Sequence, residues 1–136
     1  MKSWHSITKK YIGVPYKFGS WKIEKGLDCL AFLVLMMQEQ GYTIDWNDSI
    51  GGFTKETYVN LSDEDLINQL LYDYICKNTV KLNLYEYQVG DIVFIEVDNK
   101  IVPGILDGNA KVLTCSRLSG VILLSNMKII EARRWI

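Results

Sequence analysis

A continuous apolar run, residues 30–37, lies in the first third of the chain. Asp28 precedes the run as a candidate N-cap, and Gly41 follows it where a left-handed residue can end a helix, so a helix is predicted over residues 28–41. Because this helix is apolar on every side, it is expected in the middle of the fold. It is far too short to span a bilayer, which takes about 20 residues.

The chain before this helix is expected to begin with a second, shorter one. Trp4, Ile7 and Tyr11 recur at three- and four-residue steps, which predicts a short helix that Gly13 ends. The following residues, 14–27, contain several glycines and predict an irregular loop.

An amphipathic helix is predicted within residues 61–78. Ser62 followed three residues later by Asp65 is a variant of the capping box, so the helix is expected to start there. Its predicted core face consists of Leu66, Leu70, Tyr74 and either Ile67 or Leu71.

The remaining third of the chain predicts short strands separated by turns. The strand-like runs are VGDIVFIEV, KIVPGIL, NAKVLTCS, GVILLS and MKIIEARRWI, and the turn signals are DNK, DGN, RLSG and SN. Helices followed by a meander of strands predict an α+β fold. A chain of 136 residues without a linker or a repeat predicts one domain over residues 1–136.

Charge and cysteine content narrow the classes of partner and cofactor. With 15 basic and 16 acidic side chains, the chain has no charge excess that would attract nucleic acid or an anionic membrane. Its three cysteines are far apart in sequence, which argues against a disulfide framework. No histidines, cysteines and acidic residues cluster at ligand spacing, so neither a metal nor a cofactor is predicted. Synthesis and folding in a reducing cytoplasm are expected.

Cys29 is the candidate nucleophile. A thiol in the first turn of a helix faces unpaired backbone N–H groups and the positive end of the helix dipole, and both favour the thiolate. The alternative is a buried, inert thiol, since free cysteine is among the most buried residue types.

The surroundings of Cys29 resemble a known family. The segments GVPY at 13–16, Phe18-Gly19 and GLDC at 26–29 resemble the nucleophile region of the NlpC-type cysteine peptidases, papain-like enzymes that cut cell-wall peptides. The segment VGDIVFI is similar to that family's Pro-Gly-Asp turn and first strand, and VPGILDGNAKVLTCSRLSGVILLS to the strands that carry its other catalytic residues. The small phage-tail members are the most similar, partly because of the final EARRWI.

The resemblance implies a papain-like domain with Cys29 at a helix N-terminus packed on a C-terminal antiparallel sheet. Residues 42–83 are then a helical insertion that is atypical of the family. Tyr16 falls on a tyrosine that helps to shape the oxyanion site. Val102 takes the place of the family's general-base histidine, and Thr114 takes the place of the residue that orients it. A valine cannot accept a proton, so the resemblance implies a crippled enzyme.

Other residues have weaker claims to the site. His5 is the only histidine, lies outside every matching motif and is interpreted as an exposed helix residue. Asp91 and Asp107 are interpreted as turn residues. Cys115 is either a core residue or a neighbour of Cys29 in space.

Two functions from different classes remain open. The first is a degenerate, inactive NlpC-type domain that serves in a phage tail tip or in tail assembly, with other tail proteins as partners and the virion as its location. The second is an active cell-wall endopeptidase that cleaves peptidoglycan peptides with a base from His5 or from a partner chain. An accidental match to an unrelated cytoplasmic domain is a third possibility.

Tyr85 and Tyr87 are predicted surface contacts, and the segment ARRW belongs either to a charged edge strand or to a site for an acidic partner.

Overall fold

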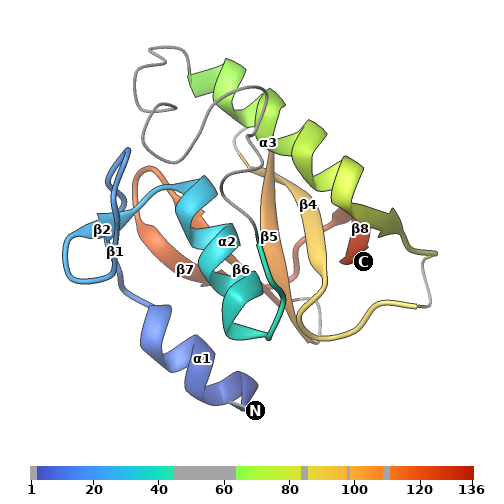
Figure 1. Cartoon of the computed structure of the whole chain (residues 1–136), viewed down its shortest axis with the longest axis horizontal. Coiled ribbons are helices and arrows are strands. Elements are labelled where there is room, and N and C mark those ends of the chain that lie inside the picture. Colours follow the sequence, from blue (N-terminus) through green and yellow to red (C-terminus); the bar gives the residue numbers. More distant parts are fainter. Residues whose placement is uncertain (1–2, 45–63, 84–85, 98, 109–110) are drawn as a thin grey trace.

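The structure is a computed structural model that describes residues 3–44, 64–83, 86–97, 99–108 and 111–136, with only the backbone of 64–68. Its helices are α1 (Trp4–Tyr11), α2 (Cys29–Glu39) and α3 (Glu64–Asn78). They lie along one face of a six-stranded sheet (Figure 1) and share one apolar cluster with it. The predicted α+β class is therefore confirmed.

Helices α1 and α2 begin and end where the sequence predicts. The Ser3 side chain accepts a hydrogen bond from the Ser6 N–H and caps α1. Asp28 caps α2 in the same way, and Gly41 follows α2 in the left-handed conformation at φ +95°. Within the described part of the chain, no helix is long and apolar enough to cross a membrane.

The loop between α1 and α2 is more regular than predicted. It contains a small antiparallel pair of strands, β1 (Trp21–Lys22) and β2 (Gly26–Leu27). Gly26 has φ +125°, and a Cβ there would stand 2.8 Å from Lys17 Cβ. Only glycine allows this left-handed, closely packed turn, which brings the chain back to the start of α2.

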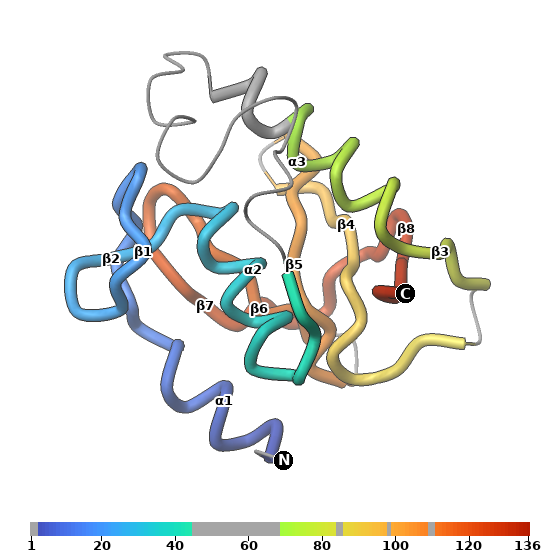
Figure 2. Tube along the Cα trace, viewed as in Figure 1, coloured from blue at the N-terminus to red at the C-terminus, as the bar shows by residue number. Residues whose placement is uncertain are grey.

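The main sheet confirms the predicted strands and corrects their order. It consists of β3 (Thr79–Lys81), β4 (Ile92–Val97), β5 (Lys100–Gly108), β6 (Lys111–Ser116), β7 (Gly120–Leu124) and β8 (Ile129–Trp135). Its order is β3-β8-β4-β5-β6-β7, and every neighbouring pair is antiparallel. Strands β4 to β7 form the predicted meander, but β8 returns to pair with β4 (Figure 2). Strand β3 was not predicted.

The turns that join these strands use the predicted residues. Asn99, Gly108, Gly120 and Asn126 all have positive φ values, between 57° and 89°, and each lies in one of the four turn signals. Asparagine and glycine tolerate this left-handed conformation better than other residues, which is why the turns are visible in the sequence.

The sheet separates two apolar clusters. Ile92 and Phe94 of β4 face the helices, whereas Val93 and Ile95 pack in a cluster on the opposite face. This alternation follows from the two-residue period of a strand. Tyr87 is half-buried against the second cluster, so it is a packing residue more than the surface contact predicted for it. Tyr85 lies outside the described residues.

Helix α3 contacts the sheet through its C-terminal half. Leu71 and Ile75 are 2% and 0% exposed, while Leu70 and Tyr74 are half-buried. Leu70, Tyr74 and the predicted alternative Leu71 therefore all contact the core, and Ile75 is the buried residue that was not predicted. Ser62 lies outside the described residues, as do the side chains of Asp65, Leu66 and Ile67.

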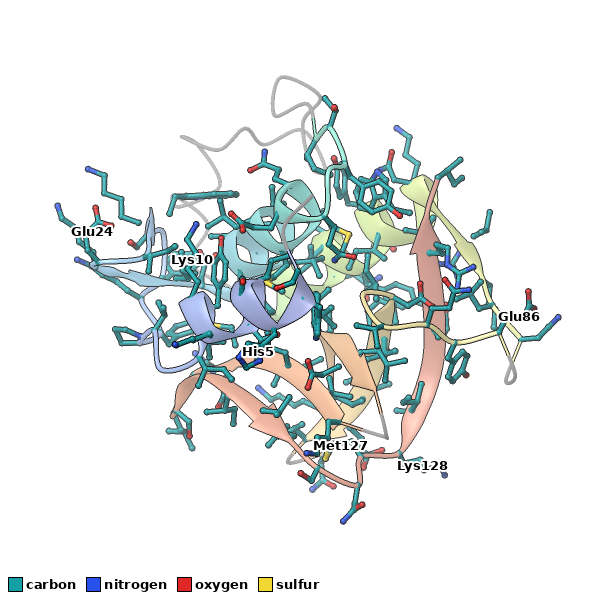
Figure 3. All side chains as sticks on the ribbon, turned by 90° about the horizontal axis from the view of Figure 1, so that it is seen from below. His5, Lys10, Glu24, Glu86, Met127 and Lys128 are labelled. Atoms are coloured by element: carbon teal, nitrogen blue, oxygen red, sulfur yellow. The ribbon has the colours of Figure 1, made fainter. Side chains whose placement is uncertain are left out.

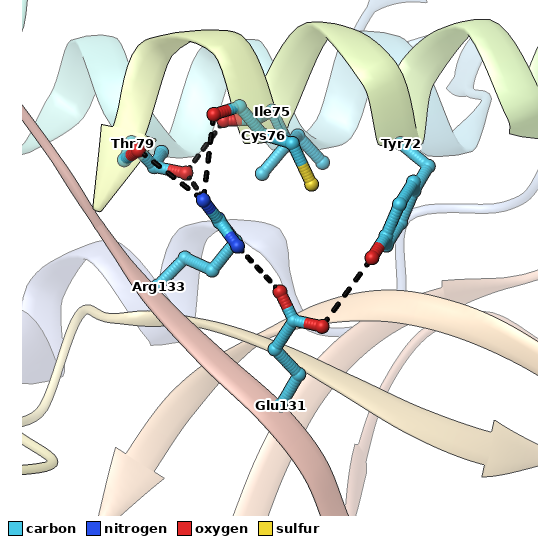
Figure 4. A network of polar contacts seen from close by, with 6 residues as sticks. All are labelled: Tyr72, Ile75, Cys76, Thr79, Glu131 and Arg133. Atoms are coloured by element: carbon cyan, nitrogen blue, oxygen red, sulfur yellow. Dashed lines mark hydrogen bonds and ion pairs between the residues drawn. The ribbon is translucent and has the colours of Figure 1, made fainter. Parts of the chain in front are cut away.

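A polar network joins α3 to β8 (Figure 4). Arg133 Nη1 and Glu131 Oε2 are 2.6 Å apart, and the Tyr72 hydroxyl donates to Glu131 Oε1 at 3.3 Å. Arg133 Nε also donates to Thr79 Oγ1 at 2.7 Å, and Nη2 to the Cys76 carbonyl at 3.4 Å. These bonds satisfy charged groups that would otherwise be costly to bury.

The neighbouring arginine is also engaged within the chain. Arg134 Nε and Nη2 each donate to Asp91 at 2.9 Å, and the buried Asp91 also accepts from the Gln88 N–H at 2.7 Å. Asp91 is thus a turn residue, as predicted, and carries a bidentate ion pair. Because β8 lies between β3 and β4, the interpretation of ARRW as a charged edge strand is wrong.

Tyr11 gives a testable pH dependence of stability. Its ring is 1% exposed, and burial, followed by the charge of Glu39, raises its pKa to about 12. An unfolded tyrosine loses its proton near pH 10, so between about pH 10 and 12 the unfolded state binds fewer protons and the free energy of unfolding falls as pH rises. We expect Tyr11→Phe to remove about 1 kcal/mol of this fall between pH 9 and pH 11. Urea unfolding at about pH 9 and about pH 11 measures it, and equal falls in both proteins would contradict this role of Tyr11.

Candidate active site

The structure brings all four site residues predicted from the sequence to one pocket. This pocket has a volume of about 430 Å³ and lies at the N-terminus of α2 beside β5 and β6. Cys29, Tyr16, Val102 and Thr114 all line it. These residues are far apart in the chain, so their meeting is a property of the fold.

Asp28 holds the start of α2 in place. It is 3% exposed, and its Oδ1 accepts from the Ala31 N–H at 2.8 Å while Oδ2 accepts from the Gly19 N–H at 2.9 Å. One carboxylate therefore caps the helix and ties down the preceding loop. Since both oxygens accept backbone hydrogen bonds, Asp28 has a structural role.

Cys29 is the first residue of α2 and is half-buried at the pocket. Its Sγ donates a hydrogen bond to the Cys115 carbonyl at 3.2 Å. Only the protonated thiol can donate this bond, because a thiolate would instead face the lone pairs of the carbonyl oxygen. The helix N-terminus favours the thiolate of Cys29, whereas the hydrogen bond to the Cys115 carbonyl favours the protonated thiol.

Tyr16 reaches the pocket through backbone pairing next to Cys29. It forms an isolated parallel bridge with Leu27. The Leu27 N–H donates to the Pro15 carbonyl at 2.9 Å, and the Lys17 N–H donates to the Leu27 carbonyl at 3.0 Å. The segment that carries Tyr16 is thus fixed against the residues that lead into Cys29.

Val102 and Thr114 line the pocket from the two adjacent strands β5 and β6. The Val102 side chain has no group that could take up a proton. Thr114 is 3% exposed, and its hydroxyl donates to the Pro103 carbonyl at 2.9 Å. Neither residue can act as a general base at neutral pH.

The remaining candidate bases do not line this pocket. His5, on α1, is exposed and lines a separate hollow together with Trp4, Lys9 and Asp107 (Figure 3). Asp107 accepts a hydrogen bond from the Trp4 indole N–H. It lies within β5, where the pairing with β6 shifts register, so its interpretation as a turn residue is wrong.

Cys115 is both a core residue and a neighbour of Cys29. It is 4% exposed and lines the pocket, and its Sγ donates to the Leu27 carbonyl at 3.3 Å. Burial raises the pKa of the Cys115 thiol far above its ordinary value, and negative charge at Cys29 and Asp28 would raise it further. Cys115 is therefore a protonated thiol at neutral pH.

Sequence reasoning missed several residues that shape the pocket. The cations Lys100 and Arg117 line it, and Leu71 contributes a wall from α3. Arg117 lies in a predicted turn, but no sequence signal connects Leu71 to Cys29. Among the residues that the structure describes, no three His, Cys, Asp or Glu side chains lie together as a metal site would require.

Comparison with known proteins identifies the fold. The chain is similar to the crystal structure of the NlpC/p60 domain of the peptidoglycan hydrolase SagA, with a TM-score of 0.51 and 19% sequence identity over 92% of each chain. No family model matches the sequence, and no curated protein matches it. The chain thus has an NlpC/p60-type, cell-wall-peptidase-like fold, as the sequence resemblance predicted.

Proposed function

We propose that this chain is a catalytically inactive NlpC/p60-type domain that serves as a structural or interaction component of a bacteriophage tail, at the tail tip or in tail assembly. The observation that carries the inactivity is the composition of the pocket around Cys29. Val102 and Thr114 stand where the resemblance calls for a base and its orienting residue, and His5 lines a different hollow.

The chemistry of amide hydrolysis makes this loss severe. A cysteine nucleophile needs a base to remove its proton and an acid to protonate the departing amine. Losing a positioned acid–base group typically costs about 10²- to 10⁴-fold in rate. In this pocket the thiol donates a hydrogen bond to the Cys115 carbonyl, which is not basic enough to remove its proton.

The phage setting rests on sequence resemblance. The helix after Asp28 and the final EARRWI are similar to those of small phage-tail members of the family. In this proposal the partners are other tail proteins, and the protein travels from the bacterial cytoplasm into the virion. Mass spectrometry of purified tail particles tests this setting separately from activity.

The retained Cys29 favours one alternative, an active cell-wall endopeptidase. A cysteine at a helix N-terminus beside a 430 Å³ pocket is the arrangement that such an enzyme needs. Among the residues that the structure describes, Asp28 is the one acidic residue in the pocket lining, and no histidine is part of it. The alternative therefore requires a base from outside the described pocket, for example from a partner chain.

Hydrolysis of purified peptidoglycan peptides distinguishes the two functions. We expect the wild-type protein and Cys29→Ala to release the same background amount of product, because the wild type lacks a base. A competent NlpC/p60 hydrolase in the same assay shows that the substrate is cleavable. Cleavage by the wild type that disappears in Cys29→Ala would overturn the proposed inactivity.

A further inference from the structure

The pocket contains two thiols whose chain segments are bonded to each other. Cys29 Sγ donates to the carbonyl of Cys115 at 3.2 Å, and Cys115 Sγ donates to the carbonyl of Leu27 at 3.3 Å. The two bonds run in opposite directions between the β2–α2 junction and β6, and α2 and β6 pack against each other. Each sulfur is thereby held against the backbone that carries the other cysteine.

The two thiols differ in access. Cys29 is half-buried and lines the pocket, whereas Cys115 is 4% exposed. Cys76, on α3, does not line the pocket, and its carbonyl takes part in the network around Arg133. A reagent that enters the pocket should therefore meet Cys29 first and find Cys115 behind it.

We propose that Cys29 and Cys115 form a reversible intramolecular disulfide, which makes the pocket a thiol oxidation site for small disulfide compounds. This property uses Cys115, for which the proposed function has no role. It also does not depend on whether the protein hydrolyses peptides.

The reaction proceeds by two thiol–disulfide exchanges. The Cys29 thiol loses its proton, and its sulfur attacks one sulfur of oxidised glutathione. The glutathione S–S bond breaks, and one glutathione leaves as a thiol with that proton. The Cys115 thiol then loses its proton and attacks the Cys29 sulfur of the mixed disulfide, so the second glutathione leaves as a thiol. The two cysteines are oxidised by two electrons, and one glutathione disulfide is reduced.

The second exchange is intramolecular, which compensates for the weak acidity of a buried thiol. The Cys29 sulfur lies 3.2 Å from the Cys115 carbonyl oxygen, and the Cys115 sulfur lies 3.3 Å from the Leu27 carbonyl oxygen, so the attacking thiol is held beside the segment that carries its target. The product would tie the start of α2 to β6 and remove both sulfurs as hydrogen-bond donors. Oxidation would thus withdraw the thiol from the pocket without adding a bulky group.

The test is treatment of the folded protein with oxidised glutathione, followed by proteolysis and mass spectrometry without reduction. We expect the intact mass to fall by two hydrogens and one crosslinked peptide pair, Cys29 with Cys115. Cys76→Ser should give the same crosslink, and dithiothreitol should reverse it. In Cys115→Ser the reaction should stop at a lasting glutathione adduct on Cys29. The same reaction in concentrated urea should give mixed pairings, which would show that the fold directs the pairing.

The peptide map of the wild-type protein tests the proposed disulfide even if Cys115→Ser does not fold. A lasting glutathione adduct on wild-type Cys29 would overturn the proposal, because it would mean that Cys115 cannot reach the mixed disulfide. Adducts on both cysteines, a crosslink that includes Cys76, or unreacted Cys29 would overturn it as well. None of these outcomes depends on peptide hydrolysis, so this proposal and the proposed function can fail separately.

Discussion

Val102→His is expected to cleave purified peptidoglycan peptides in a Cys29-dependent manner, at about 10² to 10⁴ times the wild-type rate. Val102 and Cys29 both line the pocket, so the substitution adds an imidazole to that lining, at a position that also packs against the second cluster. Thr114 lines the same pocket, and its hydroxyl, which donates to Pro103, retains lone pairs that can accept an N–H. The rate should rise with pH through about 6.5, as the new imidazole becomes neutral and able to accept the thiol proton.

Two controls make this gain interpretable. Val102→His combined with Cys29→Ala should return to background, which assigns the cleavage to the thiol. Val97→His adds an imidazole to another residue of the same pocket lining, on β4, and should gain much less. Equal activity of Val97→His and Val102→His would show that position 102 is not special. A folded Val102→His variant with only background activity would count against the assignment of this position as the missing base.

The parts of the fold that the sequence predicts well are those determined by local chemistry. Asp28 and Gly41 bound α2 because a capping carboxylate and a left-handed glycine act within one turn of the helix. The turns at Asn99 and Asn126 are visible for the same reason, since their backbone conformation depends on the residue itself.

What the sequence does not reveal is pairing between distant segments. The return of β8 to β4 is decided by burial on both faces of the sheet, and no residue in the C-terminal strand specifies its neighbour. The burial of Ile75 on α3 is of the same kind, because the buried face of a helix is selected by what packs against it.

In the candidate site, too, the sequence predicts individual residues but not which distant residues meet. Resemblance identified Tyr16, Cys29, Val102 and Thr114, and the structure places them around one pocket. The contact between Cys29 and Cys115 spans 86 positions of the chain, so the sequence left open whether Cys115 is a core residue or a neighbour of Cys29. The structure shows that it is both, because β6 supplies the core beneath α2 and one wall of the pocket.

Asp28→Ala should be among the most destabilising single substitutions near the site. It removes the N-cap of α2, which typically costs about 1 kcal/mol, and leaves the Gly19 N–H without its carboxylate acceptor, which adds about 1 to 3 kcal/mol. We expect the free energy of unfolding in urea to fall by about 2 to 4 kcal/mol. Amide hydrogen exchange at Gly19 should speed up as well, because the loop loses its tie to the helix.

Asp28→Asn and Ser3→Ala separate the two contributions. Asparagine can keep its one oxygen toward the Ala31 N–H and cap α2, but its N–H₂ group then faces the Gly19 N–H, so its cost should fall between those of wild type and alanine. Ser3 caps α1 from an exposed position, and its loss should cost only about 0.5 to 1 kcal/mol. If Asp28→Ala cost no more than Ser3→Ala, the second hydrogen bond of Asp28 would contribute nothing. Cys29 would then owe its position to the packing of α2 alone, and the carboxylate next to it would be an ordinary helix cap.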